Sequence, residues 1–237
     1  MPYRRLPNTD QARIRALAQA VKKGDDYNVY DMVISLNTLS IARNFLHKFV
    51  QAQNYYKQCF DNQARSSRQH QPSVKMARLY VSHFIQVLNM SVLRSEIKKS
   101  YKEWYGLPID NYNVPDLMTE SAIAEWGKKI IEGEHRRTSQ GGIPIYNPTI
   151  AKVRVHFNIF LEGYERQKNL QAITNRSLEK LAVMRPEADE LILDIWNQVE
   201  KKFENVVPNE SRLDKCREYG VVYYYRSTEK QKKDLTK

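Results

Sequence analysis

The chain has 237 residues, of which 41% are hydrophobic and 27% are charged, as is ordinary for a folded protein. Lys and Arg number 38 against 27 Asp and Glu, so the formal net charge is +11. No window approaches about 18 consecutive apolar residues, and the N-terminal stretch lacks the apolar core of a signal peptide. We therefore expect a cytoplasmic protein with no membrane span. Two cysteines, Cys59 and Cys216, are too few for a disulfide framework.

A first helix is expected after Asn8 and Thr9, because either side chain can accept hydrogen bonds from the free amides of a first turn. Gly24 is expected to end it. A longer helix is then predicted over residues 36–70. Its seam residues recur at alternating steps of three and four, the spacing that places side chains on one face of a helix. They are Leu39, Ala42, Leu46, Phe49, Gln53, Tyr56, Phe60 and Gln63.

Pro72 is expected to end that helix and to begin the next one, since proline lacks the amide that an interior position donates. The next helix has its own seam and an extension that stops at Gly106. Its seam residues are Val74, Ala77, Val81, Phe84, Leu88 and Val92. Three polar residues interrupt this apolar stretch, namely His83, Gln86 and Asn89. They are expected either at the margin of the seam or in a buried, hydrogen-bonded network.

Residues 107–118 contain two prolines and several Asp and Asn, so they are read as a connection. Thr119 is expected to cap the next helix, which a Gly-Gly pair closes. A second long helix should begin with Asn147 as its cap and Pro148 as its first residue. Pro186 is expected to break it. An amphipathic helix and a short helix then lead to the last predicted element, a strand.

The strand is predicted from the run "REYGVVYYYRS" at residues 217–227, where β-branched and aromatic side chains alternate. Alternation places Val221, Tyr223 and Tyr225 on one face. A single strand is unstable because its backbone groups need partners. Residues 105–109 are the predicted partner within the chain, and residues 143–146 are a third candidate strand.

The two halves of the chain show the same order of signals. Thr9 and Thr119 are 110 residues apart, and so are Asn37 and Asn147. Each half then runs through a long helix, a proline, a second helix and a Tyr-Gly stop. We therefore predict a mainly α fold, an internally duplicated four-helix bundle of two long helical hairpins with short flanking helices. A small two- or three-stranded β element is expected at one end.

The repeats are predicted to cover residues 1–118 and 119–227, packed as one domain. Residues 228–237 are predicted to be a disordered basic tail.

Motifs for chemistry are lacking, since the chain contains no nucleotide-binding glycine loop, C-x-x-C pair or G-x-S-x-G turn. The nearest metal motif is Glu132 with His135, the i, i+3 spacing of di-iron bundles. Such a site needs a second copy, and no other histidine has a glutamate three residues before it. We expect no enzyme activity, and no catalytic, cofactor-binding or metal-ligating residue.

Candidate interaction residues lie on the predicted seams and on the strand. Four glutamines lie on the two long helices, namely Gln53, Gln63, Gln167 and Gln171. In a core they would fix the register of the helices, and the alternative is that these faces bind a partner. The strand adds Tyr223, Tyr225 and Arg226 as candidates.

Several stretches resemble an uncharacterised family of small helical proteins from Bacteroidetes-type bacteria. They are "RLPNTDQARIRAL", "ARLYVSHFIQVLNM", "EWGKKIIEGE", "RPEADELILDIWNQVE" and "EYGVVYYYR". The resemblance spans nearly the whole chain. It implies a cytoplasmic helical bundle, but no activity, cofactor or partner is assigned to this family, so the resemblance leaves the function open.

Long seams without a convergent set of titratable groups favour a non-enzymatic protein that acts through protein–protein contact or as a scaffold. A homodimer is one form of this hypothesis. The alternative is a nucleic-acid-binding protein, supported by the net charge of +11 and by interleaved Tyr and Arg. The basic residues are spread thinly, however, because no five like charges follow one another.

Overall fold

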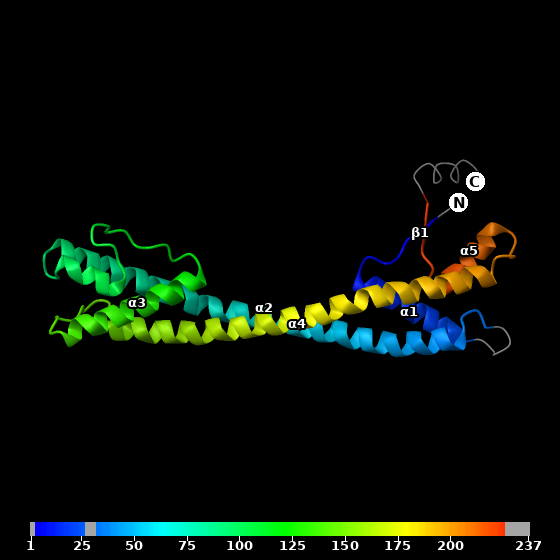
Figure 1. Cartoon of the computed structure of the whole chain (residues 1–237), viewed down its shortest axis with the longest axis horizontal. Coiled ribbons are helices and arrows are strands. Elements are labelled where there is room, and N and C mark those ends of the chain that lie inside the picture. The colour runs from blue at the N-terminus through cyan, green and yellow to red at the C-terminus, as the bar shows by residue number, and fades with distance from the viewer. Residues whose placement is uncertain (1–2, 27–31, 226–237) are drawn as a thin grey trace. The chain divides into compact units, whose positions relative to one another are not determined.

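The computed structural model describes residues 3–26 and 32–225. Of the described residues, 75% are helical, and they include a small two-stranded antiparallel sheet, so the predicted mainly α class with a small β element is confirmed (Figure 1). Two long helices dominate the fold: α2 spans Leu36–Leu93 and α4 spans Ile150–Lys202. Within the described ranges, no helix is long and apolar enough to cross a membrane.

The chain forms two compact units. Unit 1 contains residues 1–59 and 174–237, and unit 2 contains residues 60–173. The first part of α2 and the last part of α4 belong to unit 1, and the remaining parts belong to unit 2. This division follows contacts rather than sequence similarity. The predicted repeat boundaries therefore stay a prediction.

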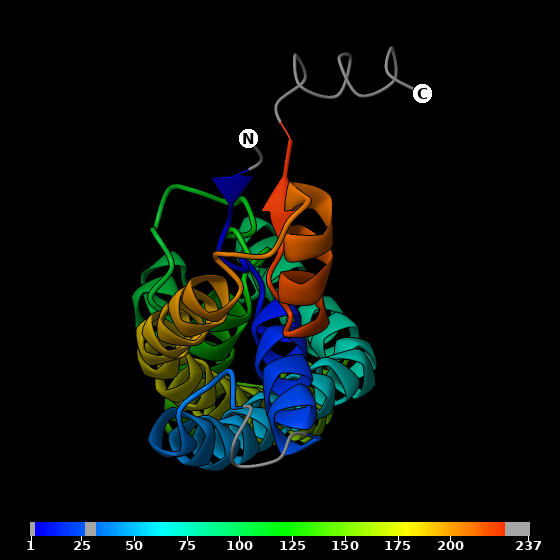
Figure 2. The ribbon, with the colours of Figure 1, turned by 90° about the vertical axis from the view of Figure 1, so that its right-hand side faces the viewer.

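In unit 1, α1 (Asp10–Asp25) and α5 (Asn209–Glu218) pack with the first part of α2 and the last part of α4 (Figures 1 and 2). The Thr9 hydroxyl accepts a hydrogen bond of 3.2 Å from a first-turn amide, so the predicted cap of α1 is confirmed. The Arg13 guanidinium donates two bonds of 2.8 Å to Asp189 and ties α1 to α4. The buried apolar cluster includes Leu17, Ala42, Phe49, Ile192, Trp196, Val199 and Tyr219.

In unit 2, α3 (Glu120–Ser139) and the 3-10 helix η2 (Lys99–Tyr105) pack with the second part of α2 and the first part of α4 (Figure 1). Thr119 caps α3 as predicted. A break after Leu93 separates α2 from η2, so the expected continuous extension is wrong. Gly106 ends η2 with a φ of 69°, which glycine adopts without steric cost. The buried cluster includes Val81, Phe84, Leu88, Tyr105, Ile123, Ile130, Val153 and Phe160.

The start of α4 differs from the prediction. The expected cap, Asn147, precedes the helix, and the Thr149 hydroxyl instead accepts a hydrogen bond of 3.3 Å from the Lys152 amide. Tyr146 and Thr149 form an isolated antiparallel bridge, which keeps the backbone from entering the helix before Ile150. The cap at Asn147 is therefore wrong.

The two prolines that were expected to end helices lie inside them. Pro72 is within α2 and Pro186 is within α4. A proline in a helix interior costs about 3 kcal/mol, because it removes an amide donor and crowds the preceding turn. His70 and Val74 are buried around Pro72, and Ala188 is buried two residues after Pro186. Packing around each proline offsets the local cost, so the predicted breaks are wrong.

The small sheet joins the two ends of the described chain. β2 (Tyr223–Tyr224) pairs antiparallel with β1 (Tyr3–Arg4), and the two strands lie side by side in Figure 2. Pairing within the chain is confirmed, but the predicted partners at residues 105–109 and 143–146 are wrong. The physical reason is a shared anchor, since Arg4 donates to Glu200 at 3.1 Å and the Tyr223 hydroxyl donates to the same carboxylate at 2.8 Å.

The predicted alternation along this segment is confirmed: Val221 is buried and Tyr223 and Tyr225 are half-buried, whereas Val222 and Tyr224 are exposed. Arg226 and the predicted tail at residues 228–237 lie outside the described residues.

The buried seams of α2 follow the predicted spacing for most of their length. Leu39, Ala42 and Phe49 are buried in unit 1, and the whole predicted seam of unit 2 is buried. Phe60, in contrast, is 53% exposed, so the first seam ends before it.

The two units are built from like parts. Each contains a short helix with a threonine cap, a part of α2 and a part of α4. Each also contains a short helical element followed by a glycine of positive φ, and the tyrosine before that glycine is buried. These pairs are Tyr219 with Gly220 in unit 1 and Tyr105 with Gly106 in unit 2. The likeness supports the internal duplication, which remains a prediction together with the four-helix arrangement.

Candidate interaction surface

One face of α2 in unit 2 carries large side chains that its own unit does not cover. They recur at steps of three and four, and all are exposed: Met76, Leu79, His83, Gln86, Met90 and Leu93. We call these six residues the 76–93 row. The exposed fractions of Leu79, Met90 and Leu93 are 57%, 55% and 57%.

The row arises because residues 74–93 are apolar on two faces of one helix. The predicted seam, from Val74 to Val92, fills the core of unit 2. The 76–93 row follows the same spacing on the face that the core leaves free. Sequence reasoning missed this row because it followed only one series of three and four steps through the stretch.

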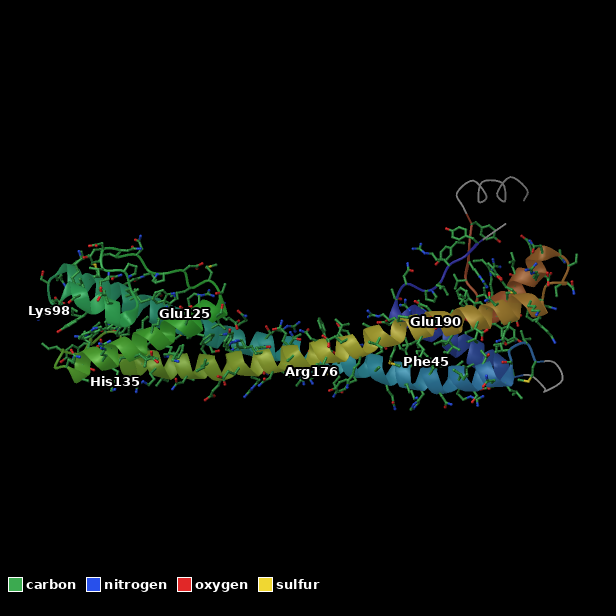
Figure 3. All side chains as sticks on the ribbon, viewed as in Figure 1. Phe45, Lys98, Glu125, His135, Arg176 and Glu190 are labelled. Carbon is green, nitrogen blue, oxygen red and sulfur yellow. The ribbon has the colours of Figure 1, made fainter. Side chains whose placement is uncertain are left out.

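Both flanks of α2 beside the row are held by unit 2. The Tyr80 ring stacks on His156 of α4, with 4.2 Å between ring centroids and 11° between planes. On the other flank, the Arg78 guanidinium donates to the carbonyls of Leu117 and Met118 at 2.9 Å each. The row therefore lies on a part of α2 that these two contacts hold in place within unit 2. Figure 3 draws the side chains of the protein, with Glu125 and His135 labelled on α3.

The three polar residues of this stretch do not share one environment. His83 and Gln86 are exposed members of the row, and within the part of the chain that the structure describes their side chains have no hydrogen-bond partner. Asn89 is buried, and its Nδ2 donates to the Tyr112 carbonyl at 2.9 Å. Of the two predicted alternatives, the buried hydrogen-bonded position therefore holds for Asn89, whereas His83 and Gln86 lie outside the buried seam.

The candidate residues chosen from the sequence are divided between the units. Unit 1 contains Gln53, Tyr223 and Tyr225, and unit 2 contains Gln63, Gln167 and Gln171. Gln171 is exposed and the other five are half-buried. The seventh candidate, Arg226, lies outside the described residues. No single unit therefore presents the predicted set as one surface.

Tyr223 has a structural role in unit 1. Its hydroxyl donates to Glu200, and burial together with that carboxylate raises the pKa of the phenol above its ordinary value. Among the other candidates, the Gln167 Nε2 is buried and has no hydrogen-bond partner within the described residues.

A buried cluster of polar side chains in unit 2 is hydrogen-bonded internally and to the backbone. Arg137 donates to Glu134 at 2.8 Å and to the Tyr105 hydroxyl at 2.9 Å. It also donates to the Ile143 carbonyl at 2.8 Å, while the Ile145 amide donates to Glu134 at 3.2 Å. Burial, with a contribution from Glu134, raises the pKa of Tyr105. The cluster ties the segment after α3 to α3 and η2.

A second polar cluster surrounds His70, beside a recess of about 230 Å³. The Ser73 Oγ lies 2.9 Å from the His70 Nδ1, and the Glu120 carboxylate lies 3.6 Å from the Nε2. The Ser73 hydroxyl donates its single proton to the His70 carbonyl at 2.7 Å, which favours Nδ1–H donation to the serine over proton abstraction from it. Gly163 leaves room for the ring, because a Cβ there would lie 2.1 Å from the Nδ1. The arrangement secures helix packing.

The Glu132 and His135 pair is exposed, and Glu132 Oε1 lies 3.9 Å from the Lys128 Nζ. Over residues 3–26 and 32–225, no group of three or more His, Cys, Asp and Glu could hold a metal ion.

Comparisons with models of protein families, with curated proteins and with solved structures find no match.

Proposed function

We propose that this protein is a non-enzymatic helical protein that acts through protein–protein contact, and that the 76–93 row is its contact surface. The observation that carries the proposal is the spacing of the row. The six exposed positions form two series with a step of seven residues, and the four large apolar side chains lie at the ends of these series, with His83 and Gln86 between them. This is the pattern with which one helix packs against another in a coiled coil.

The partner fitted by this surface is an amphipathic helix with an apolar seam of its own. Such a helix would place its side chains between those of the row and remove their apolar surface from water. Each large apolar side chain that becomes fully buried contributes about 1.5–3 kcal/mol. The fixed position of α2 lowers the entropic cost of binding, since the surface is ordered before the partner arrives.

An internal control supports the proposal. On the first part of α2, in unit 1, a row with the same spacing is also exposed: Ile41, Asn44, Lys48, Gln51, Tyr55 and Gln58. We call these residues the 41–58 row. It is mostly polar, as expected of a surface that meets only water. Two of the six residues of the 41–58 row are large and apolar, Ile41 and Tyr55, whereas four of the six are in the 76–93 row.

The absence of catalysis is supported by the state of the titratable clusters described above. Glu134 and Arg137 satisfy each other, and the Ser73 proton is held by a backbone carbonyl. Arg13, Arg137 and Arg185 are paired with carboxylates, so these three cations do not contribute to a basic surface. Nucleic-acid binding requires free cations gathered along a surface, whereas no five like charges follow one another in this sequence.

Site-specific crosslinking in the cells that produce the protein tests the proposal. A benzophenone amino acid would replace Met90 in one variant and Tyr55, its counterpart in the 41–58 row, in the control. We expect a protein adduct at position 90 that disappears when Leu79→Glu is added, and none at position 55. Equal adducts at both positions, or none at either, would contradict the proposal. An adduct removed by nuclease would establish the nucleic-acid alternative instead.

A further inference from the structure

The 76–93 row has the same chemical pattern in both directions along the helix. From its first residue it runs Met, Leu, His, Gln, Met, Leu, so two apolar residues precede two polar residues and two apolar residues follow. A surface with this symmetry is complementary to a reversed copy of itself. Building on the proposed function, we infer that the partner of the row is a second copy of this chain, docked antiparallel.

The register of this dimer follows from the symmetry. A two-fold axis would pass between Phe84 and Ile85, midway along the row, and the contact would be isologous, with the same patch used by both copies. Met76 of one copy then faces Leu93 of the other. Leu79 likewise faces Met90 of the second copy, so every large apolar side chain of the row meets another.

The polar centre specifies this register. His83 of each copy faces Gln86 of the other, and a neutral imidazole and an amide each offer both a donor and an acceptor. The two side chains have no hydrogen-bond partner within the described residues, so they are available for this pairing. A slip by one heptad would place His83 against an apolar side chain and leave a buried polar group unpaired, at a cost of about 1–3 kcal/mol.

Charge and dipole favour the antiparallel orientation over the parallel one. Lys75 lies just before the row, and the exposed pair of Arg94 and Glu96, with 2.8 Å between Nε and Oε1, lies just after it. In the antiparallel register given above, Lys75 of one copy lies opposite Arg94 of the other, whose charge is balanced by its pair with Glu96. Parallel docking would set Lys75 against Lys75 and would align the two helix dipoles.

The contact is short, since 18 residues of helix extend about 27 Å. A single pair of helices of this length belongs to the smaller class of interfaces, so we expect reversible, concentration-dependent dimers.

Engineered disulfides in the full chain test both the partner and the register. The buried native thiols are first removed with Cys59→Ala and Cys216→Ala, and circular dichroism checks that the fold is kept. Into this background go Leu79→Cys, Met90→Cys, or both. Positions 79 and 90 lie about 16 Å apart on one helix, too far for a disulfide within the chain. We expect a covalent dimer from the double variant, and also from a mixture of the two single variants.

Matched controls come from the 41–58 row, where Asn44→Cys and Tyr55→Cys occupy the corresponding positions. This pair should give no covalent dimer. In sedimentation equilibrium of the chain without introduced cysteines, Leu79→Glu should weaken self-association at least tenfold.

Two results would overturn the inference, and they differ in what they leave standing. Efficient dimers from Leu79→Cys alone would establish a parallel arrangement and refute the antiparallel register. A chain that stays monomeric and gives no covalent dimer would refute the second copy as the partner. In that case the crosslink at position 90 decides the proposed function, because an adduct with a different protein retains it and the lack of any adduct refutes it.

Discussion

The two halves of α2 have similar buried faces and different exposed faces. Each residue of the 41–58 row lies 35 positions before its counterpart in the 76–93 row, and three buried residues match at the same offset. Leu39, Ala42 and Phe49 in unit 1 correspond to Val74, Ala77 and Phe84 in unit 2, and all six are buried. The exposed rows differ, since the first is mostly polar and the second mostly apolar. Packing requirements explain the likeness of the buried faces, and the difference between the exposed faces therefore points to function.

The test with the largest expected effect compares how much one buried phenylalanine in each half of α2 contributes to the free energy of unfolding. Phe49 and Phe84 are each fully buried and occupy equivalent positions. Phe49→Ala and Phe84→Ala should each lower the free energy of unfolding by about 4 kcal/mol, because each leaves a cavity in an apolar cluster. Chemical denaturation followed by circular dichroism measures this. A loss below about 1 kcal/mol at either position would show that the two halves are not equivalent.

The second test compares the ion pairs of the two units. Glu134→Gln should cost about 3 kcal/mol, because Arg137 would stay buried without a counter-charge. Asp189→Asn in unit 1 should cost only about 1 kcal/mol, because this pair is partly exposed and Arg13 keeps Asp10 at 3.6 Å. Denaturant titrations of the two variants provide the measurement. Equal losses of unfolding free energy in the two variants would mean that burial does not make the Glu134–Arg137 pair more important than the Asp189–Arg13 pair.

The third test uses the two phenols with raised pKa values, Tyr105 in unit 2 and Tyr223 in unit 1. Tyr105→Phe and Tyr223→Phe should each cost about 1 kcal/mol by removing a hydrogen bond to a glutamate.

The pH dependence of stability provides a control for this test. In the unfolded chain tyrosine ionises near pH 10, whereas the folded protein holds these two protons to higher pH. The contribution of each phenol is complete below about pH 10 and declines above it, because the unfolded state then binds fewer protons. Each Phe variant should show a smaller decline, and an unchanged alkaline slope would contradict the assignment.

The smallest expected effect on stability comes from serine substitutions in the two exposed rows, and it compares these rows directly. Met90→Ser and Tyr55→Ser change equivalent exposed positions, so each should alter the stability of the monomer by less than about 0.5 kcal/mol. Only Met90→Ser should weaken self-association in sedimentation. A large loss of monomer stability at Met90 would mean that this side chain is part of the fold rather than of a contact surface.

Local signals in the sequence were sufficient for much of the fold. Thr9 and Thr119 cap their helices as predicted, because a cap depends on a few neighbouring residues. The seam of unit 2 is also buried as predicted, because one face of a helix is set by spacing alone.

Tertiary structure decided the features that depend on distant residues. Pro72 and Pro186 lie inside helices because side chains around them are packed. The helix propensities of neighbouring residues carry no information about this packing. The strand at Tyr223 pairs with Tyr3 and Arg4 because both strands are anchored at Glu200. No spacing rule relates segments so far apart in the chain.

The candidate surface was the least accessible to sequence reasoning. Residues 74–93 contain two rows with helical spacing, and the sequence analysis predicted only the one from Val74 to Val92. Which row is buried depends on where α3, α4 and the loop before α3 lie against α2, through contacts such as Tyr80 with His156 and Arg78 with Leu117. Periodicity fixes which side chains share a face, and only packing decides which face meets water.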